Sequence, residues 1–390
     1  MSRVTVTDAG RVYTVNVDDA RAGGDVYQAV VIAQLVDELT SEPVRARARI
    51  SSTVPARPKY AQDGVVGLAG VPRRLFPRLA TQPYPVDVAF DVDGFLPLQV
   101  EPVPGLPMQS FLAQFAGIDL GPQALRRRPI ALTVRTVELN LQNRPVALPN
   151  AVARISGIWR ATRDVLSTAP PAAADFVACM PGLYASRPQP ATTIQSITLT
   201  PAGDPIRRLL FDVAPGDTRI VVDRGGGLVA TAVIGIDRGD ADRVEHIEVL
   251  SVTAPTDPES PAIFDLRFAL QRRHRASAPV ERVTPTGPAL LANLTDDGRP
   301  GDPTLFVNSV AAFAPNPTTV QISGGTAATE YATCARYRVT TNGEGYETFP
   351  PISRVAAVEV SAALGAKTSP PRRVSPDYLV FEHRVDLTLA

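Results

Sequence analysis

The three histidines are the side chains of this 390-residue sequence best suited to acid–base or metal chemistry. His246, His274 and His383 are far apart, and none has the H-E-x-x-H or paired-ligand spacing of a zinc hydrolase. His383 shares one face of an alternating segment with apolar residues, which predicts a hydrogen-bonded core histidine. His274 lies among charged residues at 271–275, which predicts a solvated loop. His246 could face either way.

The two cysteines offer thiol chemistry. Cys179 and Cys334 are distant in sequence and fall in different predicted domains, so they form no disulfide framework. Two thiols alone also cannot complete a thiolate zinc site. The sequence therefore predicts two buried, reduced cysteines.

Two loops have compositions that could bind ions. Residues 237–242 contain Asp237, Asp240 and Asp242, which could bind calcium, but the EF-hand spacing and its closing glutamate are missing. A solvated turn is the simpler interpretation, and the Arg-Gly-Asp tripeptide at 238–240 matches an adhesion motif that often arises by chance. Residues 224–227 (Arg-Gly-Gly-Gly) could cradle an anion with backbone amides, although a hairpin tip is favoured.

Other catalytic and nucleic-acid signatures are missing from the sequence. It contains neither a G-x-S-x-G elbow nor a G-x-x-x-x-G-K-[ST] phosphate loop. The basic clusters at 126–128 and 272–275 lack interleaved aromatic residues, which favours interfaces or solvated turns over nucleic-acid sites. Trp159, the sole tryptophan, is expected to pack between sheets, with an exposed interface anchor as the alternative. We expect no catalytic residue, no cofactor and no metal.

Side chains that alternate along the chain predict the elements that carry these residues. Residues 43–51 alternate small or apolar side chains with Arg45, Arg47 and Arg49, which is typical of a strand with one dry and one wet face. A similar pattern returns at 145–146 and 153–156. This recurrence predicts an all-β chain of tandem sandwiches with at most one or two short helices.

Three other segments refine this prediction. An apolar run at 26–36 predicts a central strand. Within 130–139 the apolar positions change face between Val134 and Val137, which predicts a bulge. Residues 108–115 have the apolar spacing of one short amphipathic helix between domains.

The second half of the chain repeats itself. Residues 216–222 resemble residues 301–307, and each stretch is followed by a second strand and then by Glu-His at 245–246 or Glu-Tyr at 330–331. A duplicated strand–turn–strand unit would explain this similarity. The alternation at 378–389 predicts a terminal strand that pairs within its own sheet or along a neighbouring subunit.

Size and charge limit the organisation and the partners. About 100 to 150 residues per domain predicts three domains, at 1–122, 123–254 and 255–390. Because 39 basic residues balance 39 acidic ones, no net field attracts nucleic acid or an anionic membrane. No apolar run approaches the ~18 residues of a membrane span, and the first residues lack a signal-peptide pattern. We therefore expect synthesis in the cytoplasm.

Residues 36–50 resemble the opening of the carboxypeptidase-regulatory-like, or transthyretin-like, Ig-like sandwich. A strand ending in Asp37 is followed by Thr40-Ser41-Glu42-Pro43, where the family has Thr-Gly-x-Pro, and then by the alternating strand. Residues 63–64 and 93–95 are similar to the family's following turn and strand end, and 143–157 resemble a more divergent second copy. This resemblance implies domains that are mostly non-catalytic attachments.

Two short strings add a context. Residues 233–237 and 350–356 are similar to structural proteins of bacteriophage tails and contractile injection particles. The resulting hypothesis is a non-enzymatic structural or adaptor subunit that binds other subunits, including itself, and no small-molecule ligand. A surface module for a glycan or protein receptor is the alternative, and an enzyme with an unrecognised site is a third possibility.

Overall fold

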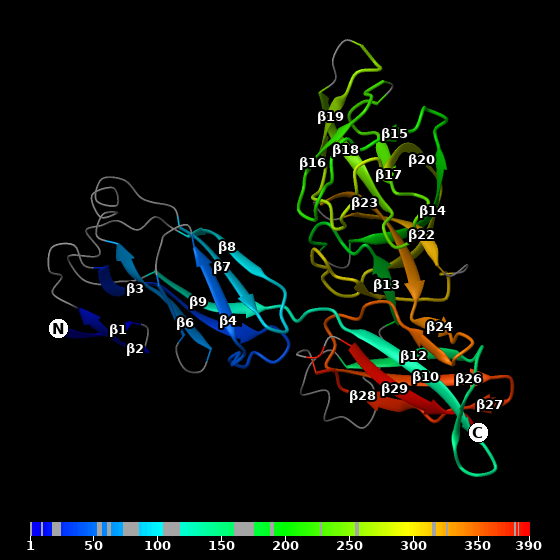
Figure 1. Ribbon diagram of the computed structural model, residues 1–390, viewed down its shortest axis with the longest axis horizontal. Helices are drawn as coiled ribbons and strands as arrows, with labels where there is room; N and C mark the ends of the chain where they lie inside the picture. Colours follow the sequence, from blue (N-terminus) through cyan, green and yellow to red (C-terminus); the bar gives the residue numbers. More distant parts are fainter. Residues whose placement is uncertain are drawn as a thin grey trace.

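The computed structural model folds the chain into β-strands that form three units (Figure 1). It describes residues 2–8, 11–17, 25–52, 57–60, 64–72, 86–103, 118–159, 175–187, 191–226, 228–253, 257–313, 317–324, 327–377, 380 and 382–390. Within these ranges every regular element is a strand, so the predicted all-β class is confirmed. The helix predicted at 108–115 lies outside the described residues.

The first unit is an N-terminal sandwich of two sheets that share one core. The buried side chains of the two sheets include Leu35, Leu68, Val88 and Phe90. One sheet contains β5 (Arg57–Tyr60), β6 (Val65–Pro72), β3 (Asp25–Asp37) and β9 (Ile118–Leu125), and the other contains β4 (Ala48–Ser52), β7 (Val86–Val92) and β8 (Leu98–Val103). A separate hairpin pairs β1 (Ser2–Asp8) with β2 (Arg11–Val17).

The alternation predicted at 43–51 is present in this sandwich. Arg45, Arg47 and Arg49 are exposed, while Val44 is buried and Ile50 packs against the core. Regular pairing starts at β4, which lies antiparallel to β7. The wet and dry faces therefore follow the sequence, as expected for a half-buried strand.

The second unit, here called the repeat unit, spans residues 175–336 and contains one continuous sheet of 11 strands. Its two long antiparallel strands, β14 (Thr193–Pro201) and β20 (Pro279–Asn293), join its two halves. The remaining strands are β13 (Asp175–Met180), β15 (Arg207–Arg208), β16 (Arg219–Val222), β17 (Val233–Ile236), β18 (Glu245–Thr253), β19 (Ala262–Leu266), β21 (Thr304–Val307), β22 (Thr318–Gly324) and β23 (Ala327–Arg336).

The repeat unit contains two copies of one small barrel. In copy 1, Leu209 and Val222 form an isolated β-bridge. In copy 2, Leu294 and Val307 form the same bridge, and each of these residues lies 85 positions after its equivalent in copy 1. Copy 1 comprises residues 207–280. Copy 2 comprises residues 292–336 and residues 175–187. The segment 175–187 precedes copy 1 in the sequence and occupies in copy 2 the position that residues 262–274 occupy in copy 1. The cores correspond in the same way, with pairs such as Ile220 and Leu305 or Leu228 and Phe313.

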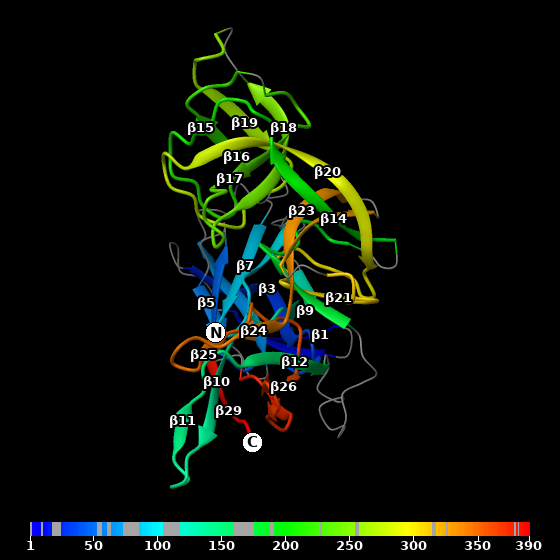
Figure 2. The ribbon, with the colours of Figure 1, turned by 90° about the vertical axis from the view of Figure 1, so that its right-hand side faces the viewer.

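The third unit is a C-terminal sandwich formed by two distant segments, 130–159 and 337–390. β10 (Ala131–Leu139) pairs with β11 (Pro145–Ala147), β25 (Tyr346–Thr348) and the parallel β29 (Glu382–Thr388). The facing sheet contains β12 (Val152–Trp159), β24 (Arg338–Thr340), β26 (Ala357–Leu364), β27 (Lys367–Thr368) and β28 (Arg372–Val374). Figure 2 shows β11 at one end of the molecule and the copy 1 strands β15 and β19 at the other.

This pairing differs from the expected division of the chain. The expected boundary near 122 lies close to the end of β9, but the boundary at 254 falls inside the repeat unit. Strands near 150 pair with strands near 360, so the second and third expected domains are not separate sheets. Strand partners in sandwiches are often remote in sequence, and local periodicity does not identify them.

The bulge predicted in β10 is also wrong. β10 pairs with β29 without a register shift, and the irregularity lies in β12 between Ile155 and Gly157. Thr136 takes the inward position after Leu132 and Val134, where its hydroxyl donates to the Leu148 carbonyl at 2.6 Å. A hydrogen-bonded hydroxyl occupies a buried position where the sequence pattern requires an apolar side chain. The polar residue at this position therefore made the strand look as if its buried face had changed.

Candidate functional site

The basic segment 126–129 connects the N-terminal sandwich to the other two units. The Leu96 amide donates to the Arg126 carbonyl at 2.7 Å, and the Arg128 amide donates to the Gly94 carbonyl at 2.9 Å. Arg127 Nε donates to Asp37 Oδ2 at 2.7 Å. The sequence left interface and solvated turn open for this cluster, and the structure places it in an interface.

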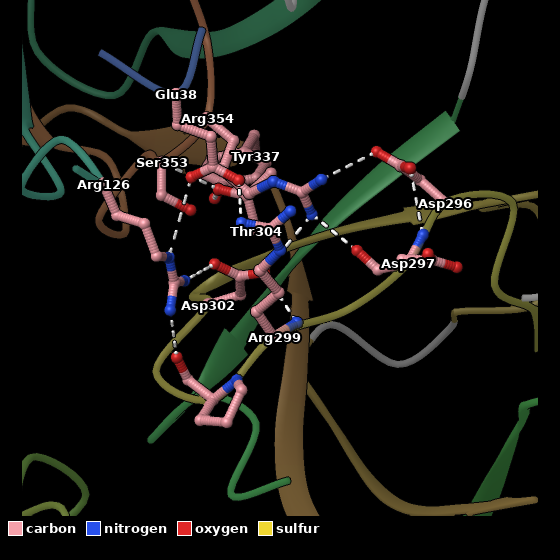
Figure 3. A network of polar contacts seen from close by, with 11 residues as sticks. Glu38, Arg126, Asp296, Asp297, Arg299, Asp302, Thr304, Tyr337, Ser353 and Arg354 are labelled. Atoms are coloured by element: carbon pink, nitrogen blue, oxygen red, sulfur yellow. Dashed lines mark hydrogen bonds and ion pairs between the residues drawn. The ribbon is translucent and has the colours of Figure 1, made fainter. Parts of the chain in front are cut away.

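Asp302 lies at the centre of this junction (Figure 3). Its side chain is fully buried and forms ion pairs with Arg126 and, at 3.2 Å, with Arg354 Nη1. Its Oδ2 also accepts the Arg299 amide at 2.9 Å. Two arginines from the linker and the C-terminal sandwich therefore meet on one carboxylate of copy 2. A buried carboxylate with several donors is strongly held, because losing one partner leaves a desolvated charge.

Charged groups around Asp302 extend the junction to all three units. Glu38, from the N-terminal sandwich, lies 3.9 Å from Arg126 Nε and also pairs with Arg299 of copy 2. Arg354 pairs with Asp296 at 3.0 Å, and its guanidinium lies over the Phe306 ring at 5.8 Å. Figure 3 shows the charged side chains of this group converging from separate elements.

An apolar contact supports the same junction. Tyr337 belongs to the core of the C-terminal sandwich, and that core includes Ala178 and Phe306 from the repeat unit. The Tyr337 hydroxyl lies 2.7 Å from Thr304 Oγ1 and donates to the Pro351 carbonyl at 2.8 Å. Burial raises the pKa of Tyr337, so its hydroxyl stays protonated and remains a donor. The repeat unit and C-terminal sandwich thus share core as well as charge.

His274 corrects the prediction of a solvated loop. It is fully buried, with Nδ1 2.8 Å from Asp237 Oδ2 and Nε2 3.0 Å from Glu245 Oε2. Burial by itself lowers the pKa of His274, but the hydrogen bonds to Glu245 and Asp237 outweigh it, and the net effect is a raised pKa. The basic residues of 271–275 gave no sign of this burial, since the partners of His274 are remote in sequence.

Copy 2 contains the same buried pair with a different cation. Arg187 occupies the place of His274, and Glu330 occupies the place of Glu245, with 3.1 Å between Arg187 Nη2 and Glu330 Oε1. The Tyr184 amide donates to Glu330 and its hydroxyl donates to Glu245, so one residue links both carboxylates. Burial raises the pKa of Glu330, whereas its hydrogen bonds and Arg187 oppose that shift. These groups stabilise the barrels, and each ring or carboxylate atom already has a protein partner.

Two of the three carboxylates in the loop at 237–242 have protein partners. Asp237 binds His274, and Asp240 accepts from Arg243 Nε at 2.7 Å. Arg272 donates to the carbonyls of Asp242 and Val244, so the second basic cluster braces this loop. Among the described residues, no group of three or more His, Cys, Asp or Glu side chains is placed to hold a metal ion.

The two cysteines lie together, which corrects their assignment to different domains. Cys179 on β13 and Cys334 on β23 are directly paired residues, and both are free and buried. A hydrogen bond with Cys334, together with burial, raises the pKa of the Cys179 thiol. The prediction of buried, reduced thiols is confirmed, although their proximity could not be read from their spacing.

The remaining single candidates have mixed outcomes. Trp159 is 1% exposed, as predicted for core packing. His383 is half-buried on the inward face of β29, with Nε2 3.0 Å from the Asp377 carbonyl. In the 224–227 loop, the Gly225 and Gly226 amides donate to the carbonyls of Ser260 and Pro258, so these two amides do not cradle an anion. Gly227 lies outside the described residues.

Three open grooves lie on the surface of the described residues. One of about 710 Å³ separates Arg154 and Ser156 of β12 from Asp175 of β13. A second, of about 750 Å³, lies where the copies meet and is lined by His246. Burial and the nearby Arg238 lower the pKa of His246 to about 4, so its ring is neutral near pH 7.

The third groove, here called the arginine groove, has a volume of about 320 Å³ on the outer face of the C-terminal sandwich. The Arg135 guanidinium lies over the Tyr346 ring at 5.4 Å, and its buried Nε has no hydrogen-bond partner among the described residues. Arg372 donates to the Asp386 carbonyl at 3.0 Å. The complete lining is Thr133, Arg135, Tyr346, Arg372, Arg384 and Asp386. Guanidinium groups in excess over carboxylates favour an anion.

Comparison of the chain with protein-family models, with curated proteins and with solved structures finds no match. Within the described ranges, no helix is long and apolar enough to cross a membrane. The geometry of the junction and grooves is therefore the basis for assigning a function. Sequence reasoning found the basic linker but missed Asp302, Arg354 and Glu38. The repeated Gly-Asp at 216–217 and 301–302 was the one signal that pointed toward Asp302.

Proposed function

We propose that this protein is a non-enzymatic structural or adaptor subunit of a large multiprotein assembly. The Asp302 junction is the observation that carries the proposal. Its ion pairs link all three β units, and the repeat unit and C-terminal sandwich also share core, which suits a part that must hold neighbouring surfaces at a defined spacing. A phage-tail-like or contractile injection particle is the proposed setting, with synthesis in the cytoplasm before incorporation.

The environment of the buried charged residues supports a structural role over an enzymatic one. His274, Glu245, Arg187 and Glu330 are buried and form one ion pair in each copy, which is the arrangement of a structural network. An active site would instead bring a nucleophile and a base to an accessible cleft. Sandwich faces and strand edges remain as the surfaces that contact other subunits.

Size fractionation of the producing cell tests the proposal. We expect the tagged full-length chain to sediment with a particle far larger than its own 41.5 kDa. Asp302→Ala should reduce incorporation, because it releases Arg126 and Arg354, whereas Glu344→Ala, at an exposed loop, should not. Recovery of all the wild-type protein as free monomer would contradict an assembly role.

The arginine groove favours a second candidate function, a surface module for an anionic glycan. Arg135 over Tyr346 presents a guanidinium beside an aromatic ring, a combination suited to a sulfate or carboxylate on a sugar. Calorimetric titration with a sulfated oligosaccharide should show salt-dependent binding that Arg135→Ala weakens and Arg49→Ala does not. Equal heats for a sulfated and an uncharged oligosaccharide would rule this candidate out.

A further inference from the structure

Each copy of the barrel contains an equivalent turn, and the two turns have different surroundings. In copy 2 the turn at 294–302 contacts Arg126 and Arg354 through Asp302. Its equivalent in copy 1, residues 209–217, has the same backbone bonds. The Gly216 amide donates to the Leu270 carbonyl at 2.7 Å, as the Gly301 amide does to the Leu183 carbonyl at 2.7 Å. The backbone frame of a docked turn is therefore present a second time.

An approximate two-fold axis relates the two copies of the barrel. β18 and β23 are equivalent strands of the two copies, and they pair antiparallel at the equivalent residues His246 and Tyr331. Antiparallel pairing of equivalent residues relates the copies by a local two-fold axis. The copy 2 turn contacts the C-terminal sandwich through Arg354, whereas Leu210, Phe211 and Asp217 of the copy 1 turn are exposed to solvent.

The copy 1 turn is exposed and more apolar than its equivalent. Leu210 and Phe211 stand where copy 2 has Thr295 and Asp296, and they are 39% and 63% exposed. Ile206, 53% exposed, lies on the same outward side as Leu210, since the intervening Arg207 and Leu209 are buried. We call Ile206, Leu210, Phe211 and Asp217 the copy 1 patch. Clustered exposed apolar side chains mark protein contact surfaces.

Asp217 gives this patch a charged anchor. Its Oδ2 accepts the Ala214 amide at 2.7 Å, just as Asp302 Oδ2 accepts the Arg299 amide at 2.9 Å. Asp302 is buried beneath two arginines, whereas Asp217 is exposed to solvent. The geometry that binds a guanidinium within the chain is thus repeated on the surface, in the same turn as Leu210 and Phe211.

The hairpin between β10 and β11 has the complementary composition. Its apolar side chains Leu139, Leu141 and Val146 are 52%, 106% and 44% exposed, and Arg144 is exposed beside them. The other turn residues, at 140, 142 and 143, are uncharged. We call Leu139, Leu141, Arg144 and Val146 the hairpin tip. Figure 2 shows β11 at the end of the molecule opposite copy 1.

We propose that the hairpin tip of one copy of this chain docks on the copy 1 patch of a second copy. Arg144 then pairs with Asp217 as Arg354 pairs with Asp302, and Leu141 packs against Leu210 and Phe211. The two surfaces differ and lie at opposite ends, so the contact is head-to-tail and repeats into a ring or a filament. This inference rests on the proposed function, because it takes a second copy as one partner of the assembly. A contact this small is weak for an isolated pair, and closure of a ring strengthens the association because the last contact is intramolecular.

Sedimentation of the purified full-length chain over a range of concentrations tests the contact. Wild-type protein is expected to self-associate, and Phe211→Asp should weaken association at least about tenfold, as for a central apolar anchor. Leu290→Asp, at a residue of β20 that is also exposed (59%), is the matched control and should associate like wild type. Both substituted positions are on the surface, so denaturation curves should show unchanged folding. Wild-type protein that stays monomeric up to millimolar concentration overturns the inference.

Mixing variants tests the head-to-tail geometry itself. Phe211→Asp keeps an intact hairpin tip, and Leu141→Asp keeps an intact copy 1 patch, so each is monomeric alone and the mixture forms a 1:1 dimer that does not grow. Likewise, Arg144→Asp and Asp217→Arg should each lose association and regain it when mixed. Mixtures that stay monomeric, or single variants that still grow, overturn the proposed contact. These outcomes leave sedimentation with a particle in the producing cell unaffected, so failure here is distinct from failure of the proposed function.

Discussion

Asp217 and Asp302 hold the same place in two copies of one barrel, yet Asp217 is exposed and Asp302 is fully buried beneath Arg126 and Arg354. Both carboxylates accept one backbone amide within their own turn. The difference in their burial therefore comes from the residues that the rest of the chain packs against each turn. This pair allows the energetic role of the junction to be measured against an internal control.

Asp302→Ala is expected to destabilise the protein by about 3–5 kcal/mol, the usual result of removing one partner from a buried ion pair. Asp217→Ala loses one hydrogen bond at an exposed turn and should cost about 1 kcal/mol. Urea denaturation at low protein concentration, where copies do not associate, measures both. Equal losses for the two variants would show that Asp302 adds nothing beyond its turn.

His246 should make the protein sensitive to acid. Its folded pKa is lowered to about 4, below the ~6.5 of an unfolded histidine, because burial and Arg238 disfavour the charged ring. Its contribution to stability is therefore present above pH ~6.5 and is lost as the pH falls toward 4. We expect urea midpoints of His246→Gln to fall less steeply over this range than those of wild type. Parallel curves would mean that His246 titrates normally.

His274 should act in the opposite direction. Hydrogen bonds to Glu245 and Asp237 raise its folded pKa despite burial, so its stabilising contribution is fully present below the unfolded pKa of ~6.5. That contribution is lost as the pH rises through the folded value. The stability difference between wild type and His274→Gln should be largest near pH 5 and shrink above pH ~6.5. A difference that instead grows with pH would contradict the charged pair.

Cys179 and Cys334 should be unreactive in the native protein. Both thiols are buried, and the hydrogen bond between them and burial raise the Cys179 pKa, so little thiolate is available. An aromatic disulfide reagent should label neither thiol in native buffer and both in urea. Rapid native labelling of either cysteine would show that the β13–β23 pair opens easily.

The strand content of this protein was predictable from the sequence because it depends on short-range alternation. Arg45, Arg47 and Arg49 reach solvent because side chains on neighbouring positions of a strand point to opposite faces. The duplication was visible in the sequence as well, in the repeated Gly-Asp turns, and the linker at 126–128 was recognised as a possible interface. Composition and periodicity determined these features without any knowledge of partners.

Only the tertiary structure decided which distant segments meet. It placed Cys179 against Cys334, buried His274 between Asp237 and Glu245, and completed copy 2 with residues that precede copy 1 in the chain. It also brought Asp302 under Arg126 and Arg354, which makes a turn residue the centre of the junction. Periodicity within a strand indicates which of its faces is buried. It does not indicate which distant strands pair and pack together, and that pairing decides whether residues such as His274 and Asp302 are buried.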